Sequence, residues 1–219
     1  MIEVVKRKIH VGLVDVSMLK YHELAFMSHV KYLMAKIEKR GIIRKPIIVD
    51  KDTMGVIDGV HRATTLRMLK ARYIPAFLID YINDEEIVVD KWFRTYTLKF
   101  PLHDEISHIK SILCIEGFEE ASNKIKICEN GIEGYIQIKN FEKEYRWYIK
   151  SIKIKERHAN IRKENVLTIE PPLLTKWNVI MAIKKNILLP PRSTRHITFL
   201  KRLYLPYNVE DLKGLGSSF

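Results

Sequence analysis

The sequence predicts an α+β protein of two domains, residues 1–96 and 97–219. In the first part, short apolar runs alternate with a segment whose apolar residues recur at helical spacing. After the break Phe100-Pro101-Leu102-His103, the pattern changes to short segments that alternate with a period of two. A length of 219 residues is sufficient for one or two compact domains.

The first domain is expected to run strand, helix, two close strands, helix, strand. The strands are expected at 11–16, 46–50, 55–58 and 73–81, with a turn at 51–55. A long helix is expected at 24–40, because apolar residues recur there at helical spacing and Gly41 follows. A second helix is expected from residue 60 to about Lys70.

The second domain is expected to begin with a helix over 104–113 and to continue with half-buried antiparallel strands. These strands are expected at 124–128, 134–138 and 145–154, with turns at 129–131 and 140–143. A further helix is expected at 173–188, after two prolines, and the end from Gly214 onward is expected to be frayed.

The composition indicates a soluble globular protein, with 29% charged and 47% hydrophobic residues. No apolar run approaches the roughly 20 residues that a membrane span needs, and the N-terminus lacks the apolar stretch of a signal peptide. We therefore expect a cytoplasmic protein with no membrane partner. The formal net charge of +12 is spread over both halves, which suits either nucleic acid or the gathering of anionic nucleotides. Richness in Lys and Glu with few Gly weakly favours a thermophilic protein.

Cys114 and Cys128 have neither metal-ligand nor CxxC spacing. Reduced, buried thiols are the default expectation in a cytoplasmic protein, and a single disulfide is the alternative. His103 and His108 lie near two acidic residues, but a metal centre there would need four ligands within reach, so we do not expect one.

The stretch Gly55-Val56-Ile57-Asp58-Gly59-Val60-His61-Arg62-Ala63 carries the strongest functional signal. A strand ends at Asp58, the chain turns at Gly59, and a helix begins. The first N–H groups of a helix lack intrahelical acceptors and carry the positive end of its dipole, so a phosphate can dock there. His61 and Arg62 add donors, for which we expect no acidic partner nearby in the sequence. From the pattern alone, an ordinary strand–turn–helix with a surface arginine is an equal alternative.

This order of elements, together with the "DGxHR" loop, resembles the ParB/sulfiredoxin fold over residues 9–92. Within that superfamily the chain is similar to the archaeal free serine kinases. Three further segments carry this likeness: His22-Glu23, Asp90-Lys91-Trp92-Phe93 and Pro190-Pro191-Arg192-Ser193-Thr194-Arg195-His196, which is similar to an "STRH" segment of the family. The family loop commonly reads Asp-Gly-His-His-Arg, and here Val60 replaces the first histidine.

The resemblance implies a kinase that transfers a phosphoryl group from ADP or ATP to the hydroxyl of free L-serine. The product would be O-phosphoserine, used in cysteine biosynthesis, and the cofactor would be Mg²⁺. Glu23 would be the catalytic base. The phosphates would bind Asp58, Gly59, Val60, His61 and Arg62. The serine would lie in a cleft formed with the second domain, against Trp92, Ser193, Thr194, Arg195 and His196, with segment 190–197 returning to the active site.

Each of these roles has a structural alternative. Glu23 is expected at a helix N-terminus, where the dipole favours a carboxylate. There it could act as the base or only stabilise the helix by its charge. Asp58 could hold Mg²⁺ or cap the N–H groups of the loop. The hydroxyls and Arg195 of the STRH segment suit a carboxylate or a phosphate, or a basic surface loop. Trp92 could wall the serine pocket or fill a core.

Two other functional classes share some of these sequence features. A ParB-like nucleic-acid-binding protein or nuclease would need a reading helix after the first domain, where strands are expected instead, so no specific nucleic acid is expected. A nucleotide-binding regulatory module would need neither the base nor the STRH segment. The sequence does not choose between ADP and ATP, and it leaves the oligomeric state open.

Overall fold

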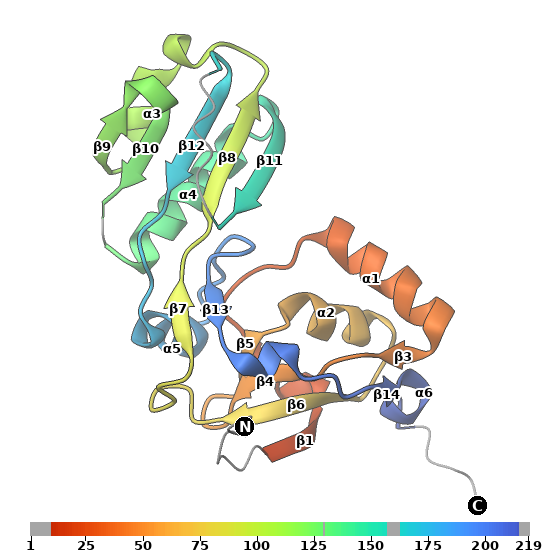
Figure 1. Ribbon diagram of the computed structural model, residues 1–219. Coiled ribbons are helices and arrows are strands. Elements are labelled where there is room, and N and C mark those ends of the chain that lie inside the picture. Colours follow the sequence, from red (N-terminus) through yellow and green to blue (C-terminus); the bar gives the residue numbers. More distant parts are fainter. Residues whose placement is uncertain (1–9, 129, 157–162, 215–219) are drawn as a thin grey trace, which may run out of the picture. The chain divides into compact units, whose positions relative to one another are not determined.

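The computed structural model describes residues 10–128, 130–156 and 163–214 (Figure 1). The chain divides into two compact units. One comprises Met1–Val88 together with Thr198–Phe219, and the other comprises Val89–Ile197. The C-terminal segment therefore packs with the N-terminal unit.

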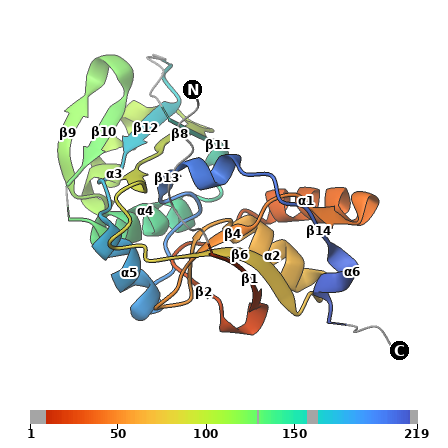
Figure 2. The same ribbon diagram turned by 60° about the horizontal axis from the view of Figure 1, so that its bottom comes forward.

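The first unit is built on a five-stranded sheet with the order β1-β6-β4-β5-β2. Strand β4 pairs in parallel with β6 and antiparallel with β5, while β2 pairs in parallel with β5. Figures 1 and 2 show the two long helices, α1 and α2, side by side. The strands are β1 (His10–Asp15), β2 (Lys20–Tyr21), β4 (Ile47–Asp50), β5 (Gly55–Asp58) and β6 (Tyr73–Ile79), and the helices are α1 (Met27–Arg40) and α2 (Val60–Met68).

The remaining elements of this unit are short. A 3₁₀ turn, η1 (Val16–Met18), follows β1. After the second unit the chain returns through the 3₁₀ turn η4 (Phe199–Arg202), strand β14 (Tyr207–Asn208) and helix α6 (Val209–Leu212). Strand β14 pairs with β3 (Ile42–Ile43), directly after α1. Val209 and Leu212 are buried in the same hydrophobic cluster as the sheet, so the C-terminal segment is part of this core.

The central strand β4 and the end of helix α1 form for the reasons that the sequence predicts. Ile47, Ile48 and Val49 are each at most 1% exposed, as a continuous apolar run in a central strand should be. Helix α1 ends at Gly41, whose φ of +67° is left-handed and favours glycine. The predicted strands and helices occur in the predicted order, although α1 begins at Met27 and not at residue 24, and the two-residue strands β2 and β3 were not predicted.

The second unit contains a five-stranded sheet with the order β11-β8-β12-β10-β9. Its strands are β8 (Phe93–Leu98), β9 (Ile115–Glu119), β10 (Lys124–Ile127), β11 (Ile149–Lys155) and β12 (Val166–Glu170). The other elements are strands β7 (Val88–Asp90) and β13 (Arg195–Ile197), which pair with each other, the 3₁₀ turns η2 (Leu102–Asp104) and η3 (Glu120–Ser122), and helices α3 (Ile106–Ile112), α4 (Ile132–Glu144) and α5 (Lys176–Lys184).

One element of the second unit was predicted wrongly. Residues 134–138 form no strand but lie in α4, which also includes the predicted turn at 140–143. The buried residues Tyr135, Ile138, Phe141 and Tyr145 explain the helix, because they recur at intervals of three and four. The expectation of antiparallel pairing alone also fails, since β10 and β12 are parallel. Residue 129 of the other predicted turn, and residues 215–218 of the expected frayed end, lie outside the described residues.

The two cysteines are paired. Cys114 and Cys128 form a disulfide with their Cα atoms 5.6 Å apart, which links the start of β9 to the end of β10. The default expectation of reduced thiols is therefore wrong for this structure, and the alternative of one disulfide applies. In the part of the chain that the structure describes, no helix is both long and apolar enough to cross a membrane.

Candidate active site

The loop between β5 and α2 has the geometry of an anion site. Gly59 has a φ of +101°, and the first intrahelical bond runs from the N–H of Ala63 to the carbonyl of Gly59 at 2.9 Å. The N–H groups of residues 60–62 precede that bond, so they lie at the positive end of the helix dipole without an acceptor within the helix. A Cβ at Gly59 would lie 2.6 Å from Cγ2 of Ile47 and 2.8 Å from Nη2 of Arg62. Only glycine fits this turn.

Arg62 has contacts that the sequence analysis did not predict. Its Nη2 lies 2.7 Å from Oδ2 of Asp58, four residues earlier, so the expectation that it lacks an acidic partner is wrong. Its Nη1 donates to the carbonyls of Lys45, at 3.1 Å, and of Pro46. The guanidinium therefore joins the loop to the segment that enters β4.

Asp58 has a cation at each carboxylate oxygen. Arg62 is on Oδ2, and Nζ of Lys201, from η4, is 2.7 Å from Oδ1. A Mg²⁺ ion would have to displace one of these cations. Among the described residues no group of three or more His, Cys, Asp or Glu side chains could hold a metal. Mg²⁺ at a nucleotide is usually held by one or two carboxylates together with waters and phosphate oxygens, so Asp58 is the residue of this loop that would hold the ion once one of its cations has moved away.

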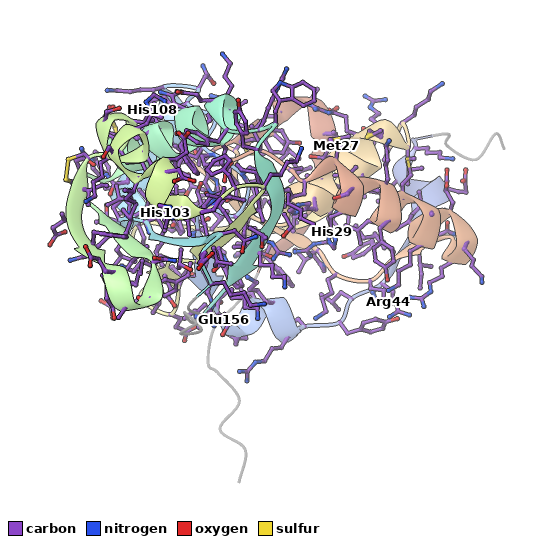
Figure 3. The ribbon with its side chains drawn as sticks, turned by 90° about the horizontal axis from the view of Figure 1, so that it is seen from above. Met27, His29, Arg44, His103, His108 and Glu156 are labelled. Atoms are coloured by element: carbon purple, nitrogen blue, oxygen red, sulfur yellow. A yellow bond between two sulfur atoms is a disulfide. The ribbon has the colours of Figure 1, made fainter. Side chains whose placement is uncertain are left out.

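His61 connects the loop to the start of α1. Its Nε2 accepts a hydrogen bond from the N–H of Phe26 at 3.0 Å, so a neutral His61 carries its proton on Nδ1. The ring of His29 approaches edge-on, with the ring centroids 4.8 Å apart. Figure 3 shows Met27 and His29 at this end of α1. Two histidine rings therefore stand beside the N-terminus of α2.

Glu23 does not lie at a helix N-terminus, as the sequence analysis assumed. It lies between β2 and α1, four residues before Met27, and is 9% exposed. The pairing of β2 with β5 places Tyr21 opposite Val56 in parallel register. Strand β2 ends at Tyr21, and Nδ1 of His22 contacts the carbonyl of Val56, so the chain still lies beside β5 at His22. The segment that leads to Glu23 is therefore positioned by contacts with β5 and not by a helix N-terminus.

His22 fixes the segment that carries Glu23. Its side chain is fully buried, and Nδ1 donates to the carbonyl of Val56 at 3.0 Å. Burial lowers the pKa of His22 to about 4, despite the hydrogen bond to Val56 and the charge of Asp58. At neutral pH His22 is therefore uncharged, and its Nε2, 3.9 Å from Oε2 of Glu23, forms no ion pair with it.

Next to this loop lies a groove of 210 Å³ between α1 and the segment after it. Its floor is apolar and its rim is cationic. Three apolar side chains line the groove, namely Leu33, Ile37 and Ile43, and the charged lining residues are Lys36, Arg40, Arg44, Lys45 and Arg62.

In the second unit, the structure brings two predicted segments together. Strand β13 pairs with β7, so Arg195 and Asp90 are adjacent, with Nη1 to Oδ2 at 2.6 Å. The indole Nε1 of Trp92 donates to the carbonyl of Thr194 at 2.9 Å. The guanidinium groups of Arg195 and Arg192 lie 5.5 Å and 5.7 Å from the centre of the Trp92 ring, at cation–π distance.

The side chains of the STRH segment are more buried than a basic surface loop would be. Ser193, Thr194 and His196 are 1%, 8% and 3% exposed, and Oγ of Ser193 donates to the carbonyl of Pro190 at 2.6 Å. Arg195 also pairs through Nη2 with Glu156 at 2.7 Å. The predicted substrate residues thus form one cluster in the second unit, and Glu23 and residues 58–62 form another in the first.

Sequence reasoning missed two sets of residues at these clusters. No sequence pattern pointed to Lys201, because it is distant from Asp58 in the sequence and meets it only in the fold. Arg94 is fully buried in β8, and its Nη1 donates to the carbonyl of Pro191 at 2.9 Å. Glu142 accepts from Nη2 of Arg94 at 2.6 Å and from the hydroxyl of Tyr96 at 2.8 Å. This network holds the start of the STRH segment.

Comparisons with known proteins agree with the predicted resemblance. No family model matches the chain. It is 29% identical over 185 residues to a "ParB-like protein" of Sulfolobus acidocaldarius, covering 82% of this chain and 86% of the relative. It is also 29% identical over 217 residues to an "ATP-dependent L-serine kinase" of Staphylothermus marinus, with 84% of each chain covered. An "ADP-dependent L-serine kinase" of Thermococcus kodakarensis is 21% identical over 240 residues, covering 94% and 91%.

Solved structures share the fold over almost the whole chain. A free serine kinase in complex with AMP superposes with a TM-score of 0.69 and 19% identity, covering 96% of this chain and 97% of that one. A variant of a free serine kinase in complex with ADP gives a TM-score of 0.71 and 18% identity over the same shares. SbnI from Staphylococcus aureus gives 0.65 and 17%, covering 86% and 83%. The predicted α+β fold is confirmed.

Proposed function

We propose that this protein is a kinase that transfers a phosphoryl group from ADP or ATP to the hydroxyl of free L-serine. Support comes from two L-serine kinases that align with most of the chain and from the fold shared with free serine kinases. The observation that carries the proposal is the parallel pairing of β2 with β5. The pairing of Tyr21 with Val56 supports a position of Glu23 near the turn at Gly59, because both lie about two residues further along the paired segments.

The nucleotide phosphates bind at the start of α2. The N–H groups of residues 60–62 donate to phosphate oxygens, the helix dipole favours their charge, and His61 adds a donor. The groove beside the loop suits the rest of a nucleotide, because its apolar floor can take the base while its cationic rim attracts the anion. Glu23, Asp58, Gly59, Val60, His61 and Arg62 together form this half of the reaction machinery.

Glu23 acts as the general base. The serine oxygen attacks the terminal phosphorus, an O–P bond forms, and the bond from that phosphorus to the leaving nucleotide oxygen breaks. A carboxylate oxygen of Glu23 takes the hydroxyl proton, so ATP leaves as ADP, or ADP as AMP. With Glu23 only 9% exposed, little water competes for that proton.

The amino acid is held by the cluster around Trp92. Free serine carries a carboxylate and an ammonium group, and the Arg195–Asp90 ion pair offers a partner for each. A bound serine can therefore exchange one ion pair for two, with its carboxylate on Arg195 and its ammonium on Asp90. Trp92, Ser193, Thr194 and His196 set the shape of this site. The use of the product in cysteine biosynthesis and a cytoplasmic location remain predictions from the sequence.

The test is direct formation of O-phosphoserine. Purified full-length protein is incubated with L-serine, Mg²⁺ and either ADP or ATP, and the products are separated by mass spectrometry. In a variant with Thr194→Ala and Arg195→Ala, the KM for serine should rise strongly while nucleotide affinity stays within about twofold. An unchanged KM for serine would remove these two residues from the substrate site.

A ParB-like relative and the net charge of +12 favour one second candidate, a DNA-binding protein. A protein that coats duplex DNA loses affinity with salt at a log–log slope of about −0.9 per phosphate contact. Weak binding at low salt is expected of any chain with this charge. Strong DNA binding at physiological salt, with no phosphoserine from either nucleotide, would replace the kinase proposal.

A further inference from the structure

Both terminal nitrogens of Arg195 are paired with carboxylates of the protein itself. Nη1 lies 2.6 Å from Oδ2 of Asp90, and Nη2 lies 2.7 Å from Oε2 of Glu156. All three residues belong to the second unit. A carboxylate ligand binds an arginine most strongly through two parallel N–H···O bonds. On Arg195 such a ligand therefore has to take the place of at least one of these two carboxylates.

Asp90 is held in place by several contacts. It lies on β7, which pairs with β13, the strand that carries Arg195. Its Oδ1 accepts a hydrogen bond from the N–H of Lys91 at 2.8 Å, and Nζ of Lys91 in turn lies 2.8 Å from Oε1 of Glu170. Asp90 therefore keeps its position when a ligand approaches, and its carboxylate stays available to an ammonium group.

Glu156 is held more weakly. It follows the end of β11, and its side chain is 55% exposed. Within the described part of the chain, the partner of its carboxylate is Arg195. An exposed ion pair of this kind contributes little, because water and salt screen the two charges. Glu156 is therefore the carboxylate that can leave Arg195 at small cost.

The guanidinium of Arg195 stays in place when Glu156 leaves. It lies 5.5 Å from the centre of the Trp92 ring, at cation–π distance. The ring itself is fixed, because its Nε1 donates to the carbonyl of Thr194 at 2.9 Å. Trp92 and Asp90 thus continue to hold Arg195, and Nη2 is the terminal nitrogen that changes its partner.

We propose that Glu156 is an internal competitor for the carboxylate of the amino-acid substrate. Without substrate, Glu156 occupies Nη2 of Arg195. The substrate carboxylate displaces it there, and the substrate ammonium binds Asp90. Glu156 thereby sets the affinity of the site for ligands that carry a carboxylate. The inference rests on the proposed function in taking Arg195 as the anchor of the serine carboxylate.

The experiment measures L-serine affinity by calorimetry on the full-length protein with excess AMP, which has no phosphoanhydride bond from which to donate. Glu156→Gln should bind L-serine about two- to sixfold more tightly, as expected when a competing exposed ion pair is removed. Glu156→Ala should show a similar gain, because it also removes the charge. The matched control is Glu116→Gln, which removes an exposed carboxylate of the same unit that pairs with Lys126 at 2.9 Å. Its serine affinity should equal that of the wild type.

L-Serinamide separates competition for Arg195 from a general effect of charge. It keeps the ammonium and the hydroxyl of serine but lacks the carboxylate, so Glu156→Gln should bring it no gain in affinity. An equal gain for serine and serinamide would contradict competition. Unchanged or weaker serine binding in Glu156→Gln would overturn the proposal, because Glu156 would then position Arg195 or bind the ammonium. Serine binding too weak to measure in both proteins would overturn it as well.

Phosphoserine formation is measured separately on the same proteins. If the wild type forms phosphoserine and Glu156→Gln gains no serine affinity, only the role of Glu156 is rejected. If neither ADP nor ATP gives phosphoserine and Glu156→Gln still binds serine more tightly, the kinase is rejected and the role of Glu156 stands.

Discussion

Replacing Gly59 with alanine tests the geometry of the turn between β5 and α2 most directly. The residue has a φ of +101°, and a new Cβ would lie 2.6 Å from Ile47 and 2.8 Å from the guanidinium of Arg62. A left-handed backbone costs a residue with a side chain about 1–2 kcal/mol, and overpacking in a filled interior costs about 1–3 kcal/mol. We expect Gly59→Ala to lower the free energy of unfolding by about 2–5 kcal/mol.

The matched control is Gly41→Ala. Gly41 also has a positive φ, +67°, but a Cβ there meets no atom within 4 Å. This variant should lose only the backbone part, about 1–2 kcal/mol. The difference between the two variants therefore measures the collision with Ile47 and Arg62.

Urea unfolding of the full-length proteins at one pH, followed by circular dichroism, gives both free energies. ADP titration of the same samples reports on the loop, and Gly59→Ala should weaken ADP binding because the new Cβ collides with Arg62 at the start of α2. Equal unfolding free energies for the two alanine variants would show that Gly59 is not packed against Arg62 as described. The account of the loop would then be wrong.

Three further predictions concern the residues behind the two clusters. Glu23→Gln should reduce turnover by about 10²–10⁴-fold with nucleotide affinity unchanged, as steady-state kinetics and calorimetry can measure; near-normal turnover would exclude Glu23 as the base. Burial lowers the pKa of His22 to about 4, so the unfolded state, with its ordinary value of 6.5, takes up the proton first. Stability should therefore fall by about 3 kcal/mol as the pH drops from 6.5 to 4, and denaturation series should show this part of the pH dependence missing in His22→Gln. Arg94→Ala should cost about 3–5 kcal/mol in urea unfolding, because it leaves the partly buried Glu142 unpaired; a loss below 1 kcal/mol would contradict the role given to this network.

Local sequence patterns predicted the first unit well because its elements are strongly marked. These signals depend only on neighbouring residues. They are the buried run 47–49, the helical spacing of α1 and the glycines at 41 and 59. The pattern of α4 was ambiguous. Ile136 and Ile138 alternate as in a strand, while Tyr135, Ile138 and Phe141 also lie on one helix face, and packing of that face against the sheet decides between the two.

The order of the longer strands and helices in the first unit and the turn at Gly59 before α2 were predictable from the sequence, because they depend on backbone preference and local periodicity. Which charged side chains form ion pairs depends on contacts between segments that are distant in the sequence. Arg195 faces Asp90 because β13 pairs with β7, and Lys201 reaches Asp58 because the C-terminal segment packs with the first unit. The position of Glu23 likewise depends on the register of β2 with β5. Long-range partners are fixed by strand pairing and burial, and no local pattern encodes them.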